Sequence, residues 1–438
     1  MQKHFQKYLN NHFSFLKEKK VLIAISGGLD SVVLTHLCKA ENLNISLAHC
    51  NFNLRDLESN EDEAFVLNLA QTLNLEVFTQ HFNTTSYAQE NNLSIQMAAR
   101  TLRYNWFQDL TERLNFDYIL TAHHADDNLE TFLINLTRGT GLSGLTGIPE
   151  TNGNIVRPLL KFSRERIENF AKQENIKWRE DSSNASTKYL RNKLRHEIIP
   201  KLKETNPKLL QNFDNTLEHL KDASSIIESS VNSVLKQAIS SAENGEVVYE
   251  ISELSKLKNK KAYLVEIFKP YGFTAFNDIE TLLSAQSGKQ IFSETHRLIK
   301  DRTQIILTAL PVQQDDKIFT ITQDVKDITL QNGILFFDKV KEVKKAFNNE
   351  IFVDEETLTY PLTVRKWQDG DYFYPLGGNG KKKLSKYFKD EKLSLLDKEK
   401  CFLLCNANKV VWVINYRADE RFKVTENTKK ILKISFKK

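Results

Sequence analysis

The sequence predicts an α/β fold with a doubly wound parallel sheet in its N-terminal part. Between residues 21 and 155, short apolar runs alternate with longer amphipathic runs, as strands and helices do in such folds. The short runs carry apolar residues on both faces of the expected strands, which is typical of strands that helices cover on both sides. Far fewer than eight strand and helix pairs are visible, so we do not expect a closed barrel.

Four strand and helix pairs account for this region. Each pair begins with an apolar run of strand length and continues into a pattern at helical spacing. The strands are expected at residues 21–25, 45–50, 75–82 and 117–124, and the helices after the first, third and fourth strands at residues 31–40, 94–114 and 128–138. A long acidic helix follows the second strand. Ligands of such sheets collect beyond the carboxyl ends of the strands, so we expect functional residues there.

The rest of the chain predicts two further domains, because 438 residues exceed the size of one ordinary core. We expect residues 1–205 to hold the sheet domain. Residues 206–310 show long helical patterns of polar and apolar residues, which predict a helical linker domain. Residues 311–438 carry strand-like runs between turns, which predict a small, basic, β-rich domain.

Charge is distributed unevenly along this chain, whose net charge is +5. Residues 363–438 contain 19 Lys and Arg against 9 Asp and Glu, so the basic excess lies at the C-terminal end. Clustered cations are what binding to a polyanion requires. A solvated, lysine-rich surface is the alternative reading of the same composition.

Cysteine usage and the lack of long apolar segments indicate a cytoplasmic protein that does not associate with a membrane. The four cysteines form no CxxC pair, so neither a structural zinc nor an iron–sulfur site is expected. No stretch approaches 18 apolar residues without charges, and the N-terminal residues lack the pattern of a cleaved leader.

A phosphate-binding loop is the sharpest local feature. It joins the first strand to the first helix and consists of Ser26, Gly27, Gly28, Leu29, Asp30 and Ser31. Adjacent glycines let backbone N–H groups approach an anion, and the helix start adds the positive end of its dipole. Bare phosphate would repel Asp30, so we expect Mg²⁺ between them. An ordinary Gly-Gly turn before a helix is the alternative, and neither a Walker loop nor a GxGxxG motif is present.

These six residues match the SGGxDS loop of the N-type ATP pyrophosphatases, or PP-loop superfamily. The resemblance implies that the nucleotide is ATP. It also implies that ATP is cleaved between its α- and β-phosphates and that an adenylated intermediate forms.

Two further polar clusters lie at strand ends that a parallel sheet brings near this loop. His49 and Asn51 close the second strand and are expected to contact the nucleotide. His123 closes the fourth strand, and Asp127 and Glu130 lie three residues apart on one face of the next helix. Two such carboxylates can hold a metal, act as a base or bind an ammonium group. A helix-capping Asp followed by a solvated Glu is the alternative.

Basic residues outside these clusters are candidates for binding phosphate or carboxylate groups. Arg100 and Arg103 lie three residues apart in a helical pattern, and surface salt bridges are their alternative role. In the terminal domain, cations alternate with Trp, Tyr and Phe near glycines, which suits attachment to a nucleic-acid backbone and base stacking. These cations are Arg365, Lys381, Lys382, Lys383 and Lys386. An ordinary β-domain core with basic edges has the same composition.

Several motifs, in order, resemble the tRNA(Ile)-lysidine synthetase family along nearly the whole chain. They are the phosphate loop and residues 123–131, 135–145 and 189–200, followed by the terminal segments 365–378, 381–390 and 410–413. Residues 393–398 depart from the family pattern, because leucine stands where proline is common.

The resemblance implies roles for single residues. It implies catalysis by Asp30, His123, Asp127 and Glu130, a metal at Asp30, and phosphate or tRNA binding by Arg191 and Arg195. The carboxylates Asp127 and Glu130 would lie where lysine and the activated base meet. The glycine-rich segment 135–147 would form a mobile loop that excludes water from the site, with a plain surface loop as the alternative. Both C-terminal domains would contact tRNA.

The implied reaction has two steps. O2 of the wobble cytidine in tRNA(Ile) with a CAU anticodon attacks the α-phosphorus of Mg²⁺-bound ATP, and the ε-amine of free L-lysine then displaces AMP at C2 to give lysidine. A homodimer is left open. A tRNA thiolase is an alternative, for which Cys50 is the only candidate thiol. A tRNA-binding adaptor with an inactive loop is another, although the intact loop argues against it.

Overall fold

A computed structural model gives the structure of the protein and describes residues 1–54, 57–180, 190–310, 318–343, 349–378 and 380–437. The chain divides into two compact units, Met1–Glu228 and Ser229–Lys438. Tyr189, the first residue of the motif 189–200, and the expected domain start at residue 311 lie outside the described residues. The three-domain division stays a prediction.

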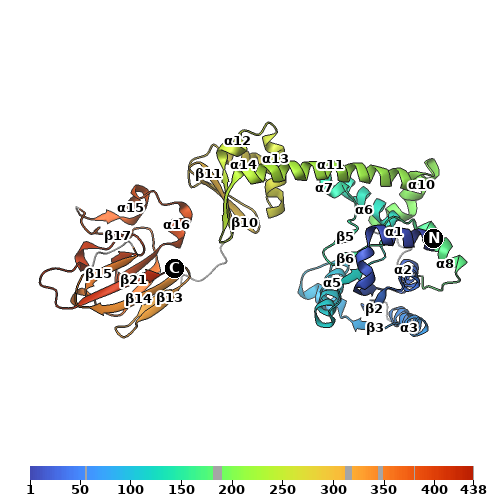
Figure 1. Cartoon of the computed structure of the whole chain (residues 1–438), viewed down its shortest axis with the longest axis horizontal. Coiled ribbons are helices and arrows are strands. Elements are labelled where there is room, and N and C mark those ends of the chain that lie inside the picture. The colour runs from blue at the N-terminus through green and yellow to red at the C-terminus, as the bar shows by residue number, and fades with distance from the viewer. Residues whose placement is uncertain (55–56, 181–189, 311–317, 344–348, 379, 438) are drawn as a thin grey trace. The chain divides into compact units, whose positions relative to one another are not determined.

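The first unit is built on a six-stranded sheet with the strand order β3-β2-β1-β4-β6-β5 (Figure 1). Its strands are β1 (Lys20–Ala24), β2 (Asn44–Asn51), β3 (Val77–His81), β4 (Tyr118–Leu120), β5 (Thr151–Asn152) and β6 (Ile155–Val156). All neighbouring strands pair in parallel except β5, which pairs with β6 antiparallel. The predicted fold class, a mostly parallel α/β sheet, is confirmed.

Helices cover both faces of this sheet, because its central strands are apolar on both sides. Val21 and Ile23 of β1 pack in one cluster, while Leu22 between them packs in another. The first cluster includes residues of α1 (Gln2–His12), α2 (Leu29–Ala40), α3 (Leu57–Thr72) and α8 (Arg164–Gln173), and the second includes residues of α5 (Ile95–Leu114). Alternate residues of one strand thus fill two cores.

A smaller third cluster surrounds helix α6 (Ala125–Thr137). Leu129 packs there with Leu194, Ile199, Phe213 and Leu217. These residues come from the π-helical turn Leu194–Ile198, α10 (Ile199–Thr205) and the long helix α11 (Leu209–Ala238). The first unit also contains α4 (Thr84–Glu90), α7 (Leu142–Leu145) and α9 (Leu190–Lys193). The packing fixes residues 190–205 against the start of α6.

The strand order reverses between β1 and β4, which pair directly. Val21 faces Tyr118, and on the other side of β1 Val21 faces Ile45 of β2. The segments that leave the carboxyl ends of β1, β2 and β4 therefore emerge side by side at a topological switch point.

The second unit holds three larger sheets. A five-stranded antiparallel sheet has the order β7-β8-β11-β10-β9, and two four-stranded sheets have the orders β12-β16-β19-β20 and β13-β14-β21-β15. The five strands of the first are Ile239–Glu243, Glu246–Glu250, Gln290–Phe292, His296–Asp301 and Gln304–Ala309, and α12 (Ile251–Ser255), α13 (Lys260–Phe268) and α14 (Phe276–Leu282) accompany them. The sequence predicted only helices across residues 206–310, so that description was incomplete. Strands of three to six residues gave a weaker sequence pattern than the helices beside them.

Both four-stranded sheets bury one common core, which includes Leu335, Val364, Trp412 and Ile434. Their strands are β12 (Phe319–Ile321), β13 (Asp327–Leu330), β14 (Gly333–Val340), β15 (Glu350–Asp354), β16 (Leu362–Lys366), β19 (Phe402–Asn406), β20 (Lys409–Val413) and β21 (Ile431–Lys437). A short ribbon of β17 (Tyr372–Phe373) and β18 (Lys382–Lys383) and the helices α15 (Leu384–Asp390) and α16 (Leu395–Lys400) complete the unit. Among the described helices, none combines the length and apolar content of a membrane span.

Candidate active site

The loop between β1 and α2 is braced by its own serines. Ser31 is buried; its Oγ donates to the carbonyl of Gly28 at 3.0 Å and accepts from the N–H of Ser26 at 3.2 Å. Gly27 has φ +87°, a left-handed conformation that only glycine adopts without strain. The sequence thus produces a tight turn that leads directly into a helix.

The first turn of α2 presents free backbone donors. Gly28 occupies the N-cap position, and no side chain caps the helix. The N–H groups of Leu29, Asp30 and Ser31 have no acceptor within the helix, because the first turn of any helix lacks one. Together with the helix dipole, they form a site for an anion.

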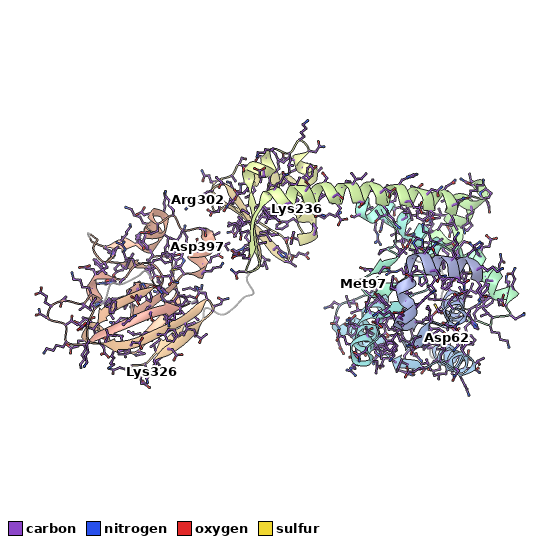
Figure 2. All side chains as sticks on the ribbon, in the orientation of Figure 1. Asp62, Met97, Lys236, Arg302, Lys326 and Asp397 are labelled. Carbon is purple, nitrogen blue, oxygen red and sulfur yellow. The ribbon has the colours of Figure 1, made fainter. Side chains whose placement is uncertain are left out.

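A distant segment fixes the loop from its other side. The N–H of Arg179 donates to the carbonyl of Gly27 at 3.0 Å. The Arg179 side chain donates to Asp62 and Glu61 of α3, at 2.8 Å each. Asp62 is labelled in Figure 2. These bonds tie the loop backbone to the start of α3.

Asp30 makes a one-sided ion pair within this loop. Its Oδ2 accepts a 2.7 Å hydrogen bond from Nη1 of Arg164, the first residue of α8. Its Oδ1 is buried and has no hydrogen-bond partner in the described part of the chain. Burial raises the pKa of Asp30 above its ordinary value, although His124 and Arg164 act in the opposite direction.

The free oxygen of Asp30 fits a divalent cation. Mg²⁺ prefers oxygen ligands, and it is commonly held by one or two carboxylates together with substrate phosphates. Within the described residues, no group of three or more His, Cys, Asp and Glu side chains forms a complete metal site. A single carboxylate beside a phosphate-binding turn therefore suits a metal that arrives with its nucleotide.

His124 connects the loop to helix α6. It caps α6 through a reciprocal capping box with Asp127, in which the His124 N–H donates to Asp127 Oδ2 at 3.0 Å. Its Nε2 lies 3.3 Å from Asp127 Oδ2 and 3.7 Å from Asp30 Oδ2. The buried imidazole of His124 thus stands between the two carboxylates.

Two arginines enclose Glu130, which is 0% exposed. Nε of Arg191 donates to Glu130 Oε2 at 2.8 Å, and Nε of Arg195 donates to Oε1 at 2.6 Å. Nη2 of Arg195 also reaches Asp127 Oδ1 at 2.9 Å. The predicted catalytic carboxylates and the predicted phosphate-binding arginines therefore form one network.

The opposite charges in this network favour the ionised forms of both Asp127 and Arg195. Burial raises the pKa of Asp127, but His124, His123 and Arg191 outweigh burial, so the pKa lies below its ordinary value. Burial lowers the pKa of Arg195, but Glu130 and Asp127 outweigh it, so that pKa is raised. The Asp127 carboxylate is accordingly ionised at neutral pH.

Asp126 links three helices behind the network. Its Oδ2 accepts the N–H of Arg164 at 2.8 Å, and its Oδ1 pairs with Nζ of Lys203 in α10. Burial raises the pKa of Asp126, and these two donors lower it further than burial raises it. Asp126 thus fixes the start of α8, from which Arg164 reaches Asp30.

His123 is half-buried among charged neighbours. Thr121 Oγ1 lies 2.9 Å from its Nδ1. Burial lowers the pKa of His123 to about 4, and Arg157 and Arg191 contribute to the shift, which exceeds the opposing effect of Asp127. The imidazole is therefore neutral at physiological pH.

The two residues at the end of β2 occupy different surroundings. His49 Nδ1 lies 3.0 Å from the carbonyl of Ile25, directly before the loop, and its buried Nε2 has no partner among the described residues. Asn51 donates to Glu63 Oε2 at 2.8 Å and accepts from the N–H of Asn53. His49 is thus positioned toward the loop, whereas Asn51 ties β2 to α3.

Arg100 and Arg103 lie exposed on α5. The Arg103 guanidinium stands 5.2 Å from the ring centre of Phe52, and that of Arg100 stands 5.1 Å from the ring centre of Tyr104. Neither forms an ion pair with a carboxylate in the described chain. Both remain available to an anionic ligand.

The glycine-rich segment after α6 is anchored to that helix. Asn135 donates to the carbonyl of Gly144 at 2.9 Å, and Asn128 accepts from the N–H of Ile148 at 2.7 Å. Gly147 has φ +77°, and a Cβ there would stand 2.4 Å from Asn128 Oδ1. The close approach requires glycine at this position.

The predicted cations of the terminal domain divide into two kinds. Arg365 makes a bidentate pair with Asp371 at 2.7 and 2.8 Å, which organises the turn after β16. Lys382 pairs with Asp390 at 2.8 Å. Lys381 lies 3.5 Å from the ring centre of Tyr372 and is exposed, as are Lys383 and Lys386.

Four site residues were missed in the sequence, namely His124, Arg164, Arg179 and Lys203. Only His124 had a visible signal, since it precedes the helix that carries Asp127. Arg164 follows Ser163, whose side chain caps α8, but nothing local indicated a partner 134 residues away.

Three family models match successive parts of the chain. A model described as the PP-loop domain matches residues 1–202, one described as the TilS substrate binding domain matches residues 242–310, and one described as the TilS substrate C-terminal domain matches residues 362–435. A tRNA(Ile)-lysidine synthase of Parabacteroides distasonis is 38% identical over 98% of each chain. Another, of Bacteroides thetaiotaomicron, is 38% identical over 99% of each chain. A solved tRNA thiolase of Methanococcus maripaludis is similar with a TM-score of 0.41 and 18% identity, over 50% of this chain and 78% of that one.

Proposed function

The chain belongs to the tRNA(Ile)-lysidine synthase family, ATP-using enzymes with a PP-loop domain, and from that membership we propose its reaction. It joins L-lysine to C2 of the wobble cytidine of tRNA(Ile) with a CAU anticodon. ATP is converted to AMP and pyrophosphate, and the tRNA then reads AUA as isoleucine. The reaction takes place in the cytoplasm.

One observation carries this proposal: the uncapped start of α2 stands beside a carboxylate with one free oxygen. The backbone donors of residues 29–31 bind the phosphates of ATP, and Asp30 Oδ1 would hold Mg²⁺. Mg²⁺ bound there would neutralise part of the phosphate charge. Arg164 keeps the other oxygen of Asp30 occupied and so orients the carboxylate.

In the first step the chain acts by positioning. Phosphoryl transfer to O2 of cytidine requires an in-line approach and stabilised charge, both of which a rigid backbone turn can supply. Ser26 and Ser31 hold that turn in shape. Arg191, which is partly exposed, provides a cation for the approaching RNA backbone.

In the second step Asp127 handles the amine of lysine. It is ionised and lies beside Asp30, so it orients the ε-ammonium group and receives a proton as the amine attacks C2. Glu130 is fully engaged by Arg191 and Arg195, so its part is to hold these arginines in place.

The terminal domain binds the body of the tRNA. Lys381, Lys383 and Lys386 are exposed around the ribbon of β17 and β18 and suit contacts to phosphates. Arg365 supports the same region through Asp371.

A single assay tests the proposal. Purified protein is incubated with ATP, Mg²⁺, labelled lysine and unmodified tRNA(Ile), and pyrophosphate release and lysine incorporation are measured. We expect both. Sulfur incorporation in a parallel reaction with a sulfur donor would instead indicate a thiolase, a role that Cys50 fits poorly, because burial raises the pKa of its thiol to about 12.

A further inference from the structure

Arg157 is a buried cation without a counter-ion. It directly follows β6 and is 6% exposed. Its Nη1 donates to the carbonyl of Pro149 at 2.7 Å, while its Nε is buried without any hydrogen-bond partner in the described chain. The described residues include no carboxylate that forms an ion pair with Arg157.

This isolation distinguishes Arg157 from its neighbours. Arg164, Arg191 and Arg195 each pair with an acidic side chain. Burying an unpaired charge is costly, and an unsatisfied buried donor adds to that cost. A buried guanidinium kept without a counter-ion therefore suits an anion that arrives as a ligand.

A second arginine lies close to Arg157. Tyr104 hydrogen-bonds Arg157, and the guanidinium of Arg100 stands 5.1 Å from the centre of the Tyr104 ring. Burial lowers the pKa of Arg157, and the charge of Arg100 lowers it further. Two positive groups thus share one aromatic side chain and have no acidic partner in the described residues.

The position of Arg157 relates this pair to the active site. Leu120 faces Val156 across the sheet, and the N–H of Thr121 donates to the carbonyl of Val156 at 3.0 Å. Thr121 in turn contacts His123. Arg157 and Asp127 both lie close enough to His123 to act on its pKa. A neutral imidazole therefore stands near both Arg157 and the carboxylate of Asp127.

We propose that Arg157 and Arg100 bind the α-carboxylate of the amino-acid substrate while Asp127 binds its ε-ammonium group. The inference rests on the proposed function and adds the subsite that distinguishes an amino acid from a simple diamine. Lysine carries opposite charges at its two ends, and the site offers a matching cation pair and anion. The aliphatic chain lies alongside the uncharged ring of His123.

The test compares lysine with 1,5-diaminopentane, which is lysine without its carboxylate. The ratio of kcat/KM for lysine to kcat/KM for the diamine is measured in the wild type and in Arg157→Gln and Arg100→Gln. We expect each substitution to reduce this ratio on the order of 10- to 100-fold, since each removes one charge-assisted contact. The diamine rate, the KM for tRNA and lysine-independent pyrophosphate release should stay at wild-type values.

Controls keep the outcome interpretable. Arg113→Gln is the matched control, because Arg113 lies near the end of α5, the helix that carries Arg100, and pairs with Asp109. It should leave the ratio unchanged. Arg157→Lys should restore part of the discrimination. If Arg157→Gln does not fold, exposed Arg100 decides the matter alone. The inference is overturned if Arg100→Gln leaves the lysine-to-diamine ratio unchanged, or if it raises the KM for tRNA and does not lower that ratio. A wild type that releases no pyrophosphate overturns the proposed function itself.

Discussion

Arg164 Nη1 lies 2.7 Å from Oδ2 of Asp30, while Oδ1 of the same carboxylate is buried without a partner among the described residues. Only one side of this carboxylate is satisfied. A half-satisfied buried carboxylate costs stability, which is a common property of functional sites. The state of the Asp30 carboxylate therefore affects both the stability of the fold and the proposed reaction.

Replacing Asp30 by Asn should separate these two effects. The pKa of Asp30 is raised in the folded chain, so its ionised form favours the unfolded state as pH rises through that pKa. At neutral pH we expect Asp30→Asn to keep or raise Tm while pyrophosphate release falls on the order of 100- to 1,000-fold. Asp109→Asn, in a surface ion pair on α5, is the control and should change neither quantity. A lower Tm in Asp30→Asn would show that the carboxylate stabilises the fold.

Replacing Gly27 by Ala tests the shape of the phosphate loop. A Cβ at Gly27 would meet only ordinary contacts, the nearest at 3.5 Å, so the cost comes from its φ of +87° and should be about 1–2 kcal/mol of unfolding free energy. Gly153→Ala is a matched control, because Gly153 also has positive φ, at +58°, with open space around it. Denaturant unfolding should show similar losses in both variants, and isothermal titration should show weakened ATP binding only in Gly27→Ala. Equal ATP affinity in both would argue against the loop as the phosphate site.

Replacing Glu130 by Gln should destabilise the protein more than replacing Asp127 by Asn. Glu130 is fully buried between Arg191 and Arg195, and removal of its charge leaves these two arginines with Asp127 as their shared counter-ion, at a cost of about 3–5 kcal/mol. The double variant with Glu130→Gln and Arg195→Gln should lose less unfolding free energy than the sum of the two single losses, by about 0.5–3 kcal/mol. Chemical denaturation of the wild type, the two single variants and the double variant measures this coupling, and the same measurement on Asp127→Asn gives the comparison. Strict additivity would contradict the network.

The stability of the protein should fall in acid partly through His123. Its pKa is about 4 in the folded chain and close to its ordinary value of 6.5 in the unfolded chain. The neutral ring therefore contributes stability that is present above pH 6.5 and is lost as pH falls toward 4, roughly 3 kcal/mol in total. Unfolding free energies of wild type and His123→Asn, measured from pH 7 to pH 4, should show a shallower decline in the variant. Parallel curves would contradict the neutral state of the His123 ring in the folded chain.

Two cations of the terminal domain should respond differently to substitution. Exposed Lys386, if it contacts a phosphate, contributes to the salt dependence of tRNA binding, so Lys386→Gln should reduce the slope of log K against log salt by about 0.7–0.9. Arg365→Gln breaks the pair with Asp371 and should lower Tm. Lys326→Gln, at an exposed site labelled in Figure 2, is the control for both measurements. If Arg365→Gln changed the salt dependence of tRNA binding without changing Tm, Arg365 would be assigned to direct contact with a tRNA phosphate.

Much of the site could be predicted from local sequence. The phosphate loop is continuous, and strand ends in a parallel sheet converge by geometry alone, so the amino-acid sequence was enough to group Asp30, His49 and Asp127. The apolar runs likewise indicated the order of strand and helix in the first unit.

Partners distant in sequence could not be predicted. Arg164 and Asp30 are separated by 134 residues, and Arg195 and Glu130 by 65. No periodicity links such residues, because the fold alone decides which side chains face each other. For the same reason, the sequence could not show that Arg195, expected to bind phosphate or tRNA, pairs with Asp127 and Glu130, expected at the lysine site.

The pairing of β1 with β4 has an electrical consequence. It sets the starts of α2 and α6 next to each other, so two peptide macrodipoles, each equivalent to roughly half an elementary charge, direct their positive poles toward one region. That field originates in the main chain, so no side-chain replacement can remove it. An insertion that displaces either first turn would abolish it, which makes the spacing between strand and helix as critical as any functional group.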